Sequence, residues 1–186
     1  MFYYFCNTQL RSYNTDTDTS ALICDFKDEF PSAAFIITGS EGDASLDRRY
    51  WSFMVQDSSY HLLSVVVYDK TENKIVGRKD SGFPDKVNWV GMDMSGNHCF
   101  IGYDELTYAQ LFSRDLKSSF TLPDGSNGHG DLALTADGKD VVVYQNVRTD
   151  YIAMADLDTG TETPLVEIPI SLTFPNRSRY DNCKTG

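Results

Sequence analysis

The chain has 186 residues, of which 41% are hydrophobic, so it is long enough for one domain with its own core. Its 27 acidic and 16 basic residues give a net charge of −11, which argues against nucleic-acid partners and anionic membrane surfaces, because both require a basic surface. No apolar run approaches the roughly 18 residues of a membrane span, so we expect no membrane insertion. The apolar start at residues 1–6 indicates a strand and not a signal peptide, since it lacks a basic flank and a small-residue cleavage site.

Turn signals divide the chain into units that share one order of β-rich runs and polar turns. In chain order, the predicted boundaries are a partial unit at 1–30, full units at about 31–80, 84–124 and 127–168, the start of another unit at 168–175, and a polar tail at 176–186. The last full unit is the clearest, because Asp137-Gly138 and Asp158-Thr159-Gly160 each separate two β-rich runs. Gly and Asp tolerate positive φ, so these pairs predict hairpins.

Three turns repeat at a nearly constant spacing. The turns at 46–48, 94–96 and 136–138 have their central residues Asp47, Ser95 and Asp137 at intervals of 48 and 42 residues. These intervals match the roughly 40–50 residues of one four-stranded propeller blade. The repeat therefore predicts a series of similar antiparallel sheets.

The motifs of the last unit resemble those of a known repeat. Residues 137–144, DGKDVVVY, followed by residues 155–160, ADLDTG, resemble the TolB-type, WD40-like β-propeller repeat, with a distant similarity to oligogalacturonate-lyase-type propellers. The resemblance covers roughly residues 9–170. It implies an all-β fold, a β-propeller of about four antiparallel four-stranded blades. Two versions stay open: a small ring closed by pairing the terminal strands, or an incomplete part of a larger propeller.

The resemblance also sorts the loops onto faces. In a propeller, the loops that enter the inner strands and those that join the second and third strands share one face, the top face. Loop residues assigned to this face are mostly acidic, and an acidic concave face concentrates cations and basic partners. The candidate ligand-binding residues on this face are Glu41, Asp43, His129, Asp131 and Arg148.

Gly128-His129-Gly130-Asp131 is the sharpest local feature of the sequence. Side chains at positions i and i+2 of an extended strand point to one face, so His129 and Asp131 are the candidate ligands of a divalent metal. In the structural alternative, His129 contacts a neighbouring blade and Asp131 caps a turn. The sequence assigns no catalytic residue.

Two functions from different classes fit these features. The first is a non-catalytic binding scaffold with a protein, small-molecule or glycan ligand on the acidic top face. Its further partners would be the remaining propeller blades or a second copy. The alternative is a metal-assisted glycan-active enzyme, a polysaccharide lyase or hydrolase. No nucleophile elbow, P-loop or HExxH motif occurs, so the scaffold is favoured and the question of an enzyme stays open.

The four cysteines form no CxxC pair, which gives no support to zinc or thioredoxin-type chemistry. Cys24 and Cys99 lie in β-rich runs and are expected to be buried thiols. Cys6 and Cys183 lie near opposite ends of the chain, and closure of a ring would allow a disulfide between them. The sequence leaves the compartment open, with an extracellular or periplasmic location favoured.

Overall fold

The computed structural model describes residues 1–38, 44–93, 95–103, 109–121, 126–134, 140–146, 151–156, 159 and 161–167. All regular structure in this part of the chain is β-strand. The strands are β1 (Phe2–Cys6), β2 (Gln9–Asn14), β3 (Thr19–Asp25), β4 (Phe35–Ile37), β5 (Tyr50–Gln56), β6 (Leu62–Asp69), β7 (Lys74–Lys79), β8 (Val87–Met92), β9 (His98–Tyr103), β10 (Ala109–Ser113), β11 (Ser119–Thr121), β12 (Ser126–Leu134), β13 (Asp140–Asn146), β14 (Tyr151–Asp156) and β15 (Glu162–Glu167). Within these residues no helix is long and apolar enough to cross a membrane.

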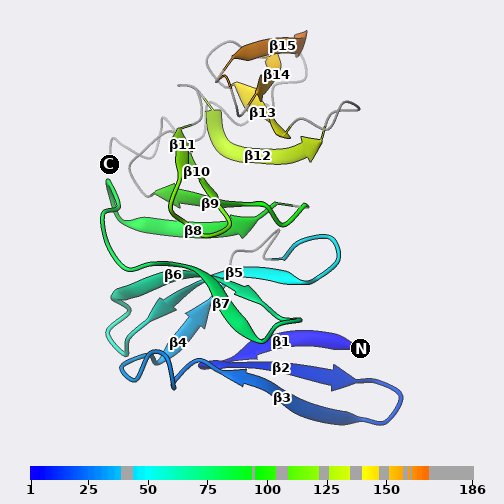
Figure 1. The fold of residues 1–186 in the computed structure, drawn as a ribbon, viewed down its shortest axis with the longest axis vertical. Helices are drawn as coiled ribbons and strands as arrows, with labels where there is room; N and C mark the ends of the chain where they lie inside the picture. Colours follow the sequence, from blue (N-terminus) through cyan, green and yellow to red (C-terminus); the bar gives the residue numbers. More distant parts are fainter. Residues whose placement is uncertain are drawn as a thin grey trace, which may run out of the picture.

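The strands form consecutive antiparallel sheets in which neighbours in sequence pair with each other. The first sheet has the order β1-β2-β3, and the next three are β4-β5-β6-β7, β8-β9-β10-β11 and β12-β13-β14-β15. Figure 1 shows them following one another along the long axis of the molecule, from β1–β3 in blue to β12–β15 in yellow and orange. Consecutive four-stranded antiparallel sheets stacked in this way are the blades of a β-propeller.

The second sheet is buried on both faces, which explains its nearly continuous apolar strands. On β5, Trp51 and Phe53 pack toward the first sheet, whereas Met54 packs toward the third. On β6, Val66 joins the core with the first sheet and Val65 the core with the third. Because successive side chains of a strand point to opposite faces, one strand supplies two cores.

The core between the first two sheets is aromatic. The Phe26 ring, which is 1% exposed, packs edge-on against Phe53 and Tyr68 with ring centroids 4.8 and 5.1 Å apart. Phe5 of β1 contacts Trp51 and Phe53 at 5.9 and 5.2 Å. Edge-on aromatic pairs add to the free energy gained from burial, so these rings fix the position of the first sheet.

The core between the second and third sheets is mainly aliphatic, with the rings of Tyr103 and Phe112 at its side, and one edge of it requires a glycine. Val90 and Ile101 of the third sheet are fully buried here. At the outer edge, a Cβ on Gly77 of β7 would lie 2.2 Å from the backbone oxygen of Arg114. The backbones approach too closely there for any side chain, so Gly77 is required by this interface.

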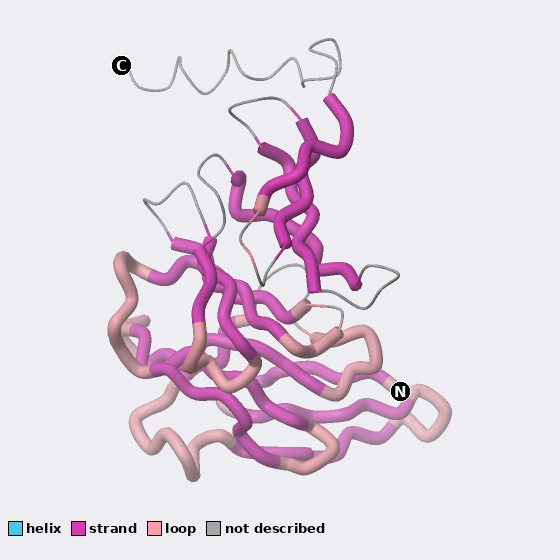
Figure 2. The backbone as a smooth tube through the Cα atoms, turned by 45° about the horizontal axis from the view of Figure 1, so that its top comes forward, coloured by secondary structure: helices cyan, strands magenta, loops and turns pink. Residues whose placement is uncertain are grey.

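The connections between strands gather at the two ends of the strands, where Figure 2 draws them in pink. At one end lie residues 7–8, 26–34, 57–61 and 80–86, which link β1–β2, β3–β4, β5–β6 and β7–β8; this end is the top face. Contacts hold these connections together: Phe26 and Ile36 donate backbone hydrogen bonds to Thr8 and Asn7 at 2.9 and 2.8 Å. At the other end, the bottom face, lie residues 15–18, 45–49, 70–73, 95–97 and 114–118.

The structure confirms the predicted all-β fold of about four antiparallel blades. The first sheet has three strands, and within the described residues it does not pair with the last sheet, so the row of blades is open. Cys6, Cys24 and Cys99 carry free thiols, and burial raises the pKa of Cys99 to about 12. Cys183, residues 168–175 and the tail at 176–186 lie outside the described residues, so the predictions made for them stay predictions.

Replacement of Phe26 by alanine tests the core between the first two sheets. We expect Phe26→Ala to lower the free energy of unfolding by about 3–5 kcal/mol, because it removes a fully buried ring and leaves a cavity. Leu46→Ala is the matched control, since Leu46 is 74% exposed, and it should change stability by less than about 0.5 kcal/mol. Equal effects of the two substitutions in urea denaturation would contradict this packing.

Candidate functional site

The structure places His129 and Asp131 on β12, the first strand of the last sheet. Asp131 pairs with Val143 and Gly130 with Tyr144, but the register shifts between Ser126 and Gly130. His129 lies in this irregular stretch, so the regular alternation that would direct it to the same face as Asp131 is interrupted before Gly130. Only the backbone of this strand is described, and a shared metal site at these two residues stays a prediction.

The remaining predicted ligand-binding residues, Glu41, Asp43 and Arg148, lie outside the described residues. Among the side chains that the structure does describe, no group of three or more His, Cys, Asp or Glu residues could hold a metal ion. The structure describes the top-face side chains in the connections that follow β1, β3, β5 and β7.

The β5–β6 connection is a tight turn built on Asp57. Its carboxylate accepts hydrogen bonds from the backbone nitrogens of Ser59 and His61 at 2.8 and 2.9 Å. The Asp57 nitrogen donates to the His61 oxygen at 3.0 Å, and the Tyr60 nitrogen donates to the Asp57 oxygen at 3.1 Å. Four hydrogen bonds within five residues hold the turn in one conformation.

Tyr60 has an unusual backbone conformation in this turn. Its φ is +63°, a left-handed region that asparagine and glycine adopt readily and a bulky residue rarely does. The ring is 68% exposed and lies parallel to Phe35 of β4, with centroids 5.2 Å apart and an interplanar angle of 6°. The turn therefore presents a flat, solvent-facing aromatic surface at the top face.

One carboxylate and one imidazole lie in the same turn as Tyr60. The His61 ring lies 3.3 Å from the second carboxylate oxygen of Asp57 and is 79% exposed. The backbone hydrogen bond from His61, followed by that from Ser59, lowers the pKa of Asp57 despite some desolvation. Asp57 is thus ionised at neutral pH in the same turn as the exposed Tyr60 ring.

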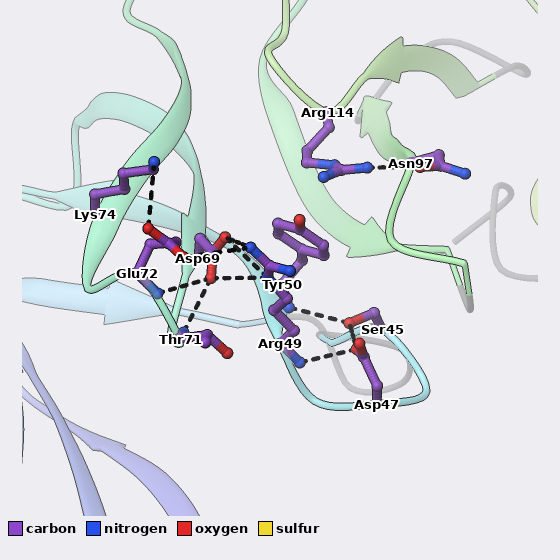
Figure 3. A network of polar contacts seen from close by, with 10 residues as sticks. All are labelled: Ser45, Asp47, Arg49, Tyr50, Asp69, Thr71, Glu72, Lys74, Asn97 and Arg114. Atoms are coloured by element: carbon purple, nitrogen blue, oxygen red, sulfur yellow. Dashed lines mark hydrogen bonds and ion pairs between the residues drawn. The ribbon is translucent and has the colours of Figure 1, made fainter.

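The bottom face uses its charges for structure. Arg49 donates two hydrogen bonds to the carboxylate of Asp69 through Nε and one through Nη2, at 3.1, 3.0 and 2.8 Å, and Figure 3 shows this pair at the start of the β6–β7 turn. Asp69 is 2% exposed and also accepts from the nitrogens of Thr71 and Glu72. Burial alone would raise the pKa of Asp69, but the hydrogen bonds from Arg49 and Glu72 outweigh it and lower that pKa.

Tyr50 links the second and third sheets at this end. The guanidinium of Arg114 lies 3.9 Å from the centre of the Tyr50 ring and donates to Asn97 at 2.6 Å. A Cβ on Gly96 would lie 2.6 Å from the same ring, and the φ of Gly96 is +75°. The residues around Arg49 therefore serve packing between blades and pairing of charges.

Asp93 ends β8 in a similar way. It is 3% exposed and accepts hydrogen bonds from the His98 nitrogen at 2.8 Å and from the Ser95 hydroxyl. Burial raises the pKa of Asp93, but the hydrogen bonds from His98 and Ser95 outweigh it, so the net shift is downward. Part of the acidity of this chain therefore stabilises turns.

The comparisons with known proteins give no family. No family model matches the chain, and no curated protein matches it. Among solved structures, a functionally unknown protein from Desulfotomaculum acetoxidans is 14% identical with a TM-score of 0.50, over 87% of this chain and 50% of that one. The β-propeller domain of Cps50 (Swd1) from Myceliophteria thermophila is 9% identical with a TM-score of 0.46, over 88% of this chain and 54% of that one. TolB from Acinetobacter baumannii is 16% identical with a TM-score of 0.43, over 86% of this chain and 38% of that one.

This chain thus spans between 38% and 54% of the length of these three structures. At such identities the likeness concerns the fold alone. The assignment of a β-propeller fold rests on the order and pairing of the sheets in this chain itself.

Substitution of Asp93 tests the structural use of acidic residues. A carboxyl whose folded pKa is lowered stabilises the protein above its unfolded pKa of 3.8, and this contribution is lost as pH falls through the folded value. We expect Asp93→Asn to lower the free energy of unfolding at pH 7 by about 1–3 kcal/mol. The asparagine amide has only one acceptor oxygen, so the Ser95 hydroxyl or the His98 nitrogen would face an NH2 group and lose its hydrogen bond. It should also flatten the fall in stability below about pH 4.

Asp80→Asn is the control, since Asp80 pairs with Arg78 at the surface and its loss should cost less than about 1 kcal/mol. Urea denaturation between pH 2.5 and 7 measures both effects. An unchanged pH profile for Asp93→Asn would contradict this role.

Proposed function

We propose that this protein is a non-catalytic interaction scaffold that binds an extended basic segment of a protein partner on its top face, with Tyr60 as the central contact. The observation that carries the proposal is the combination of a left-handed backbone with an exposed aromatic ring at Tyr60. A turn that needs only its shape would be served better by asparagine or glycine.

The free energies favour a role for the ring itself. A left-handed conformation costs a residue with a Cβ roughly 1–2 kcal/mol. Stacking on Phe35 returns about 0.5–1.5 kcal/mol, so the tyrosine brings little net stability to the fold. Strained residues of this kind concentrate at binding sites, and exposed tyrosine is among the residues enriched in protein interfaces.

The charge of the site indicates the chemistry of the partner. The ionised carboxylate of Asp57 lies in the same turn as Tyr60, and the whole chain carries a net charge of −11. An aromatic face beside a carboxylate attracts lysine and arginine side chains through both the ring and the charge. Phe35 adds apolar surface beside the ring.

The residues predicted from sequence extend this proposal. His129, Asp131 and Arg148 would add contacts to this site, and a divalent metal at His129 and Asp131 would be an additional element of it. Glu41 and Asp43 belong by sequence to the β4–β5 connection, whose described end at residues 45–49 lies at the bottom face, so they do not enter this proposal. The glycan-active alternative has no observation among the described side chains in its favour.

Replacement of Tyr60 by glycine separates binding from stability. Glycine accepts the left-handed conformation, so we expect Tyr60→Gly to leave the free energy of unfolding within about 1 kcal/mol of the parent. It should weaken binding of a fluorescein-labelled peptide of alternating lysine and glycine about tenfold, as loss of a central aromatic contact does. Fluorescence anisotropy at low and high salt measures the affinity.

Arg48→Gly is the matched control, because Arg48 is exposed and has a φ of +59° in a turn of the bottom face. This variant should bind the peptide as the parent does. Equal binding by Tyr60→Gly and the parent, or no binding of the basic peptide by the parent, would contradict the proposal.

A further inference from the structure

The first sheet lacks one strand that the other three sheets possess. It consists of β1, β2 and β3, whereas each of the others has four strands. The missing position can be identified, because the β1–β2 turn meets the start of β4 through the hydrogen bond from Ile36 to Asn7 at 2.8 Å. In the second sheet, the connection that lies at this end joins the second and third strands, β5 and β6. Thus β1 corresponds to the second strand of a four-stranded blade. Within the described residues, no strand occupies the place of the first strand beside β1.

The edge of β1 lacks the features that protect an exposed strand. Its sequence is Phe2-Tyr3-Tyr4-Phe5-Cys6, which contains no proline and no charged residue. Unprotected apolar edges pair readily with another strand, because their backbone donors and acceptors lack partners there. This edge can therefore accept a strand.

The outward face of the first sheet is also uncovered. Phe2 is 64% exposed, Tyr4 38% and Leu22 51%, and these side chains alternate with Tyr3 and Phe5, which pack on the second sheet. By contrast, the strands β5 and β6 of the second sheet are buried on both faces. The first sheet therefore presents three large apolar side chains to solvent, together with Arg11, which pairs with both Tyr4 and Leu22 across the strands.

The sequence contains a segment suited to the vacant edge. Ile170-Ser171-Leu172-Thr173-Phe174 alternates apolar and polar residues and follows β15 after only Ile168 and Pro169. In the described structure β15 and β1 lie at opposite ends of the row, with β4 to β11 between them (Figure 1). A link of two residues spans roughly 10 Å at most, so the segment can reach such an edge only on another molecule.

We infer that two copies of this chain associate head to tail. The last sheet of each copy covers the face of the other that contains Phe2, Tyr4 and Leu22, and residues 170–174 supply the strand beside β1. This arrangement continues between copies the packing that already joins the second sheet to the first and third. Two copies of four sheets make a ring of eight blades, within the range of closed propellers.

The dimer surface is separate from the proposed peptide site at Tyr60, so the two can be tested independently. The test is the mass of the 186-residue chain by light scattering after gel filtration, between about 1 and 100 µM. We expect twice the monomer mass of 20.9 kDa. Leu22→Lys should shift the mass to that of one copy, since it places a charge in the sheet interface.

Leu46→Lys is the matched control, because Leu46 is 74% exposed but lies in the turn before β5 on the bottom face, and this variant should remain dimeric. On the donor side, Leu172→Pro removes a backbone donor within the segment and should give monomers, whereas Lys184→Pro in the tail should not. Unchanged tryptophan fluorescence from the buried Trp51 checks that each variant is folded.

A parent chain that is monomeric at 100 µM would overturn the inference. So would a dimer that persists in both Leu22→Lys and Leu172→Pro, because the contact would then lie elsewhere. A dimer lost equally in Leu46→Lys would also count against this surface.

Discussion

The structure depends on one constraint: a sheet whose strands are apolar on both faces must be covered on both. In the second sheet, Trp51 and Phe53 face one neighbour while Met54, one residue along the same strand, faces the other. This alternation forces the sheets into a row. The row in turn directs the connections to two ends, and it brings the turn with Tyr60 beside Phe35 at the start of β4.

The same constraint explains where acidic residues are used. The strands are joined by tight turns at the top and bottom faces. Aspartate carboxylates accept hydrogen bonds from the backbone N–H groups that such turns leave without a partner. Asp57, Asp69 and Asp93 all act in this way. The negative charge of the chain is therefore partly a consequence of its many turns, and only Asp57 of these three stands beside an exposed aromatic ring on the top face.

The fold followed from the sequence more readily than the site. Repeated turns and alternating runs are local features, so the series of antiparallel sheets could be predicted from them. The pairing of Arg49 with Asp69 joins the turn before β5 to the last residue of β6, twenty positions along the chain. The left-handed φ of Tyr60 has no signature in its residue type, so neither feature could be predicted from the sequence. The expected alternation at His129 and Asp131 assumed a regular strand, but a register shift interrupts the pairing before Gly130.

The first two sheets pack face to face through aromatic rings, and the rest of the row builds on this contact. The most direct test is a nuclear Overhauser spectrum of the protein with its phenylalanine rings assigned. Cross-peaks between the ring protons of Phe26 and Phe53, whose centroids lie 4.8 Å apart, are expected. Assigned rings of Phe26 and Phe53 without any cross-peak between them would contradict the stacked arrangement of these sheets.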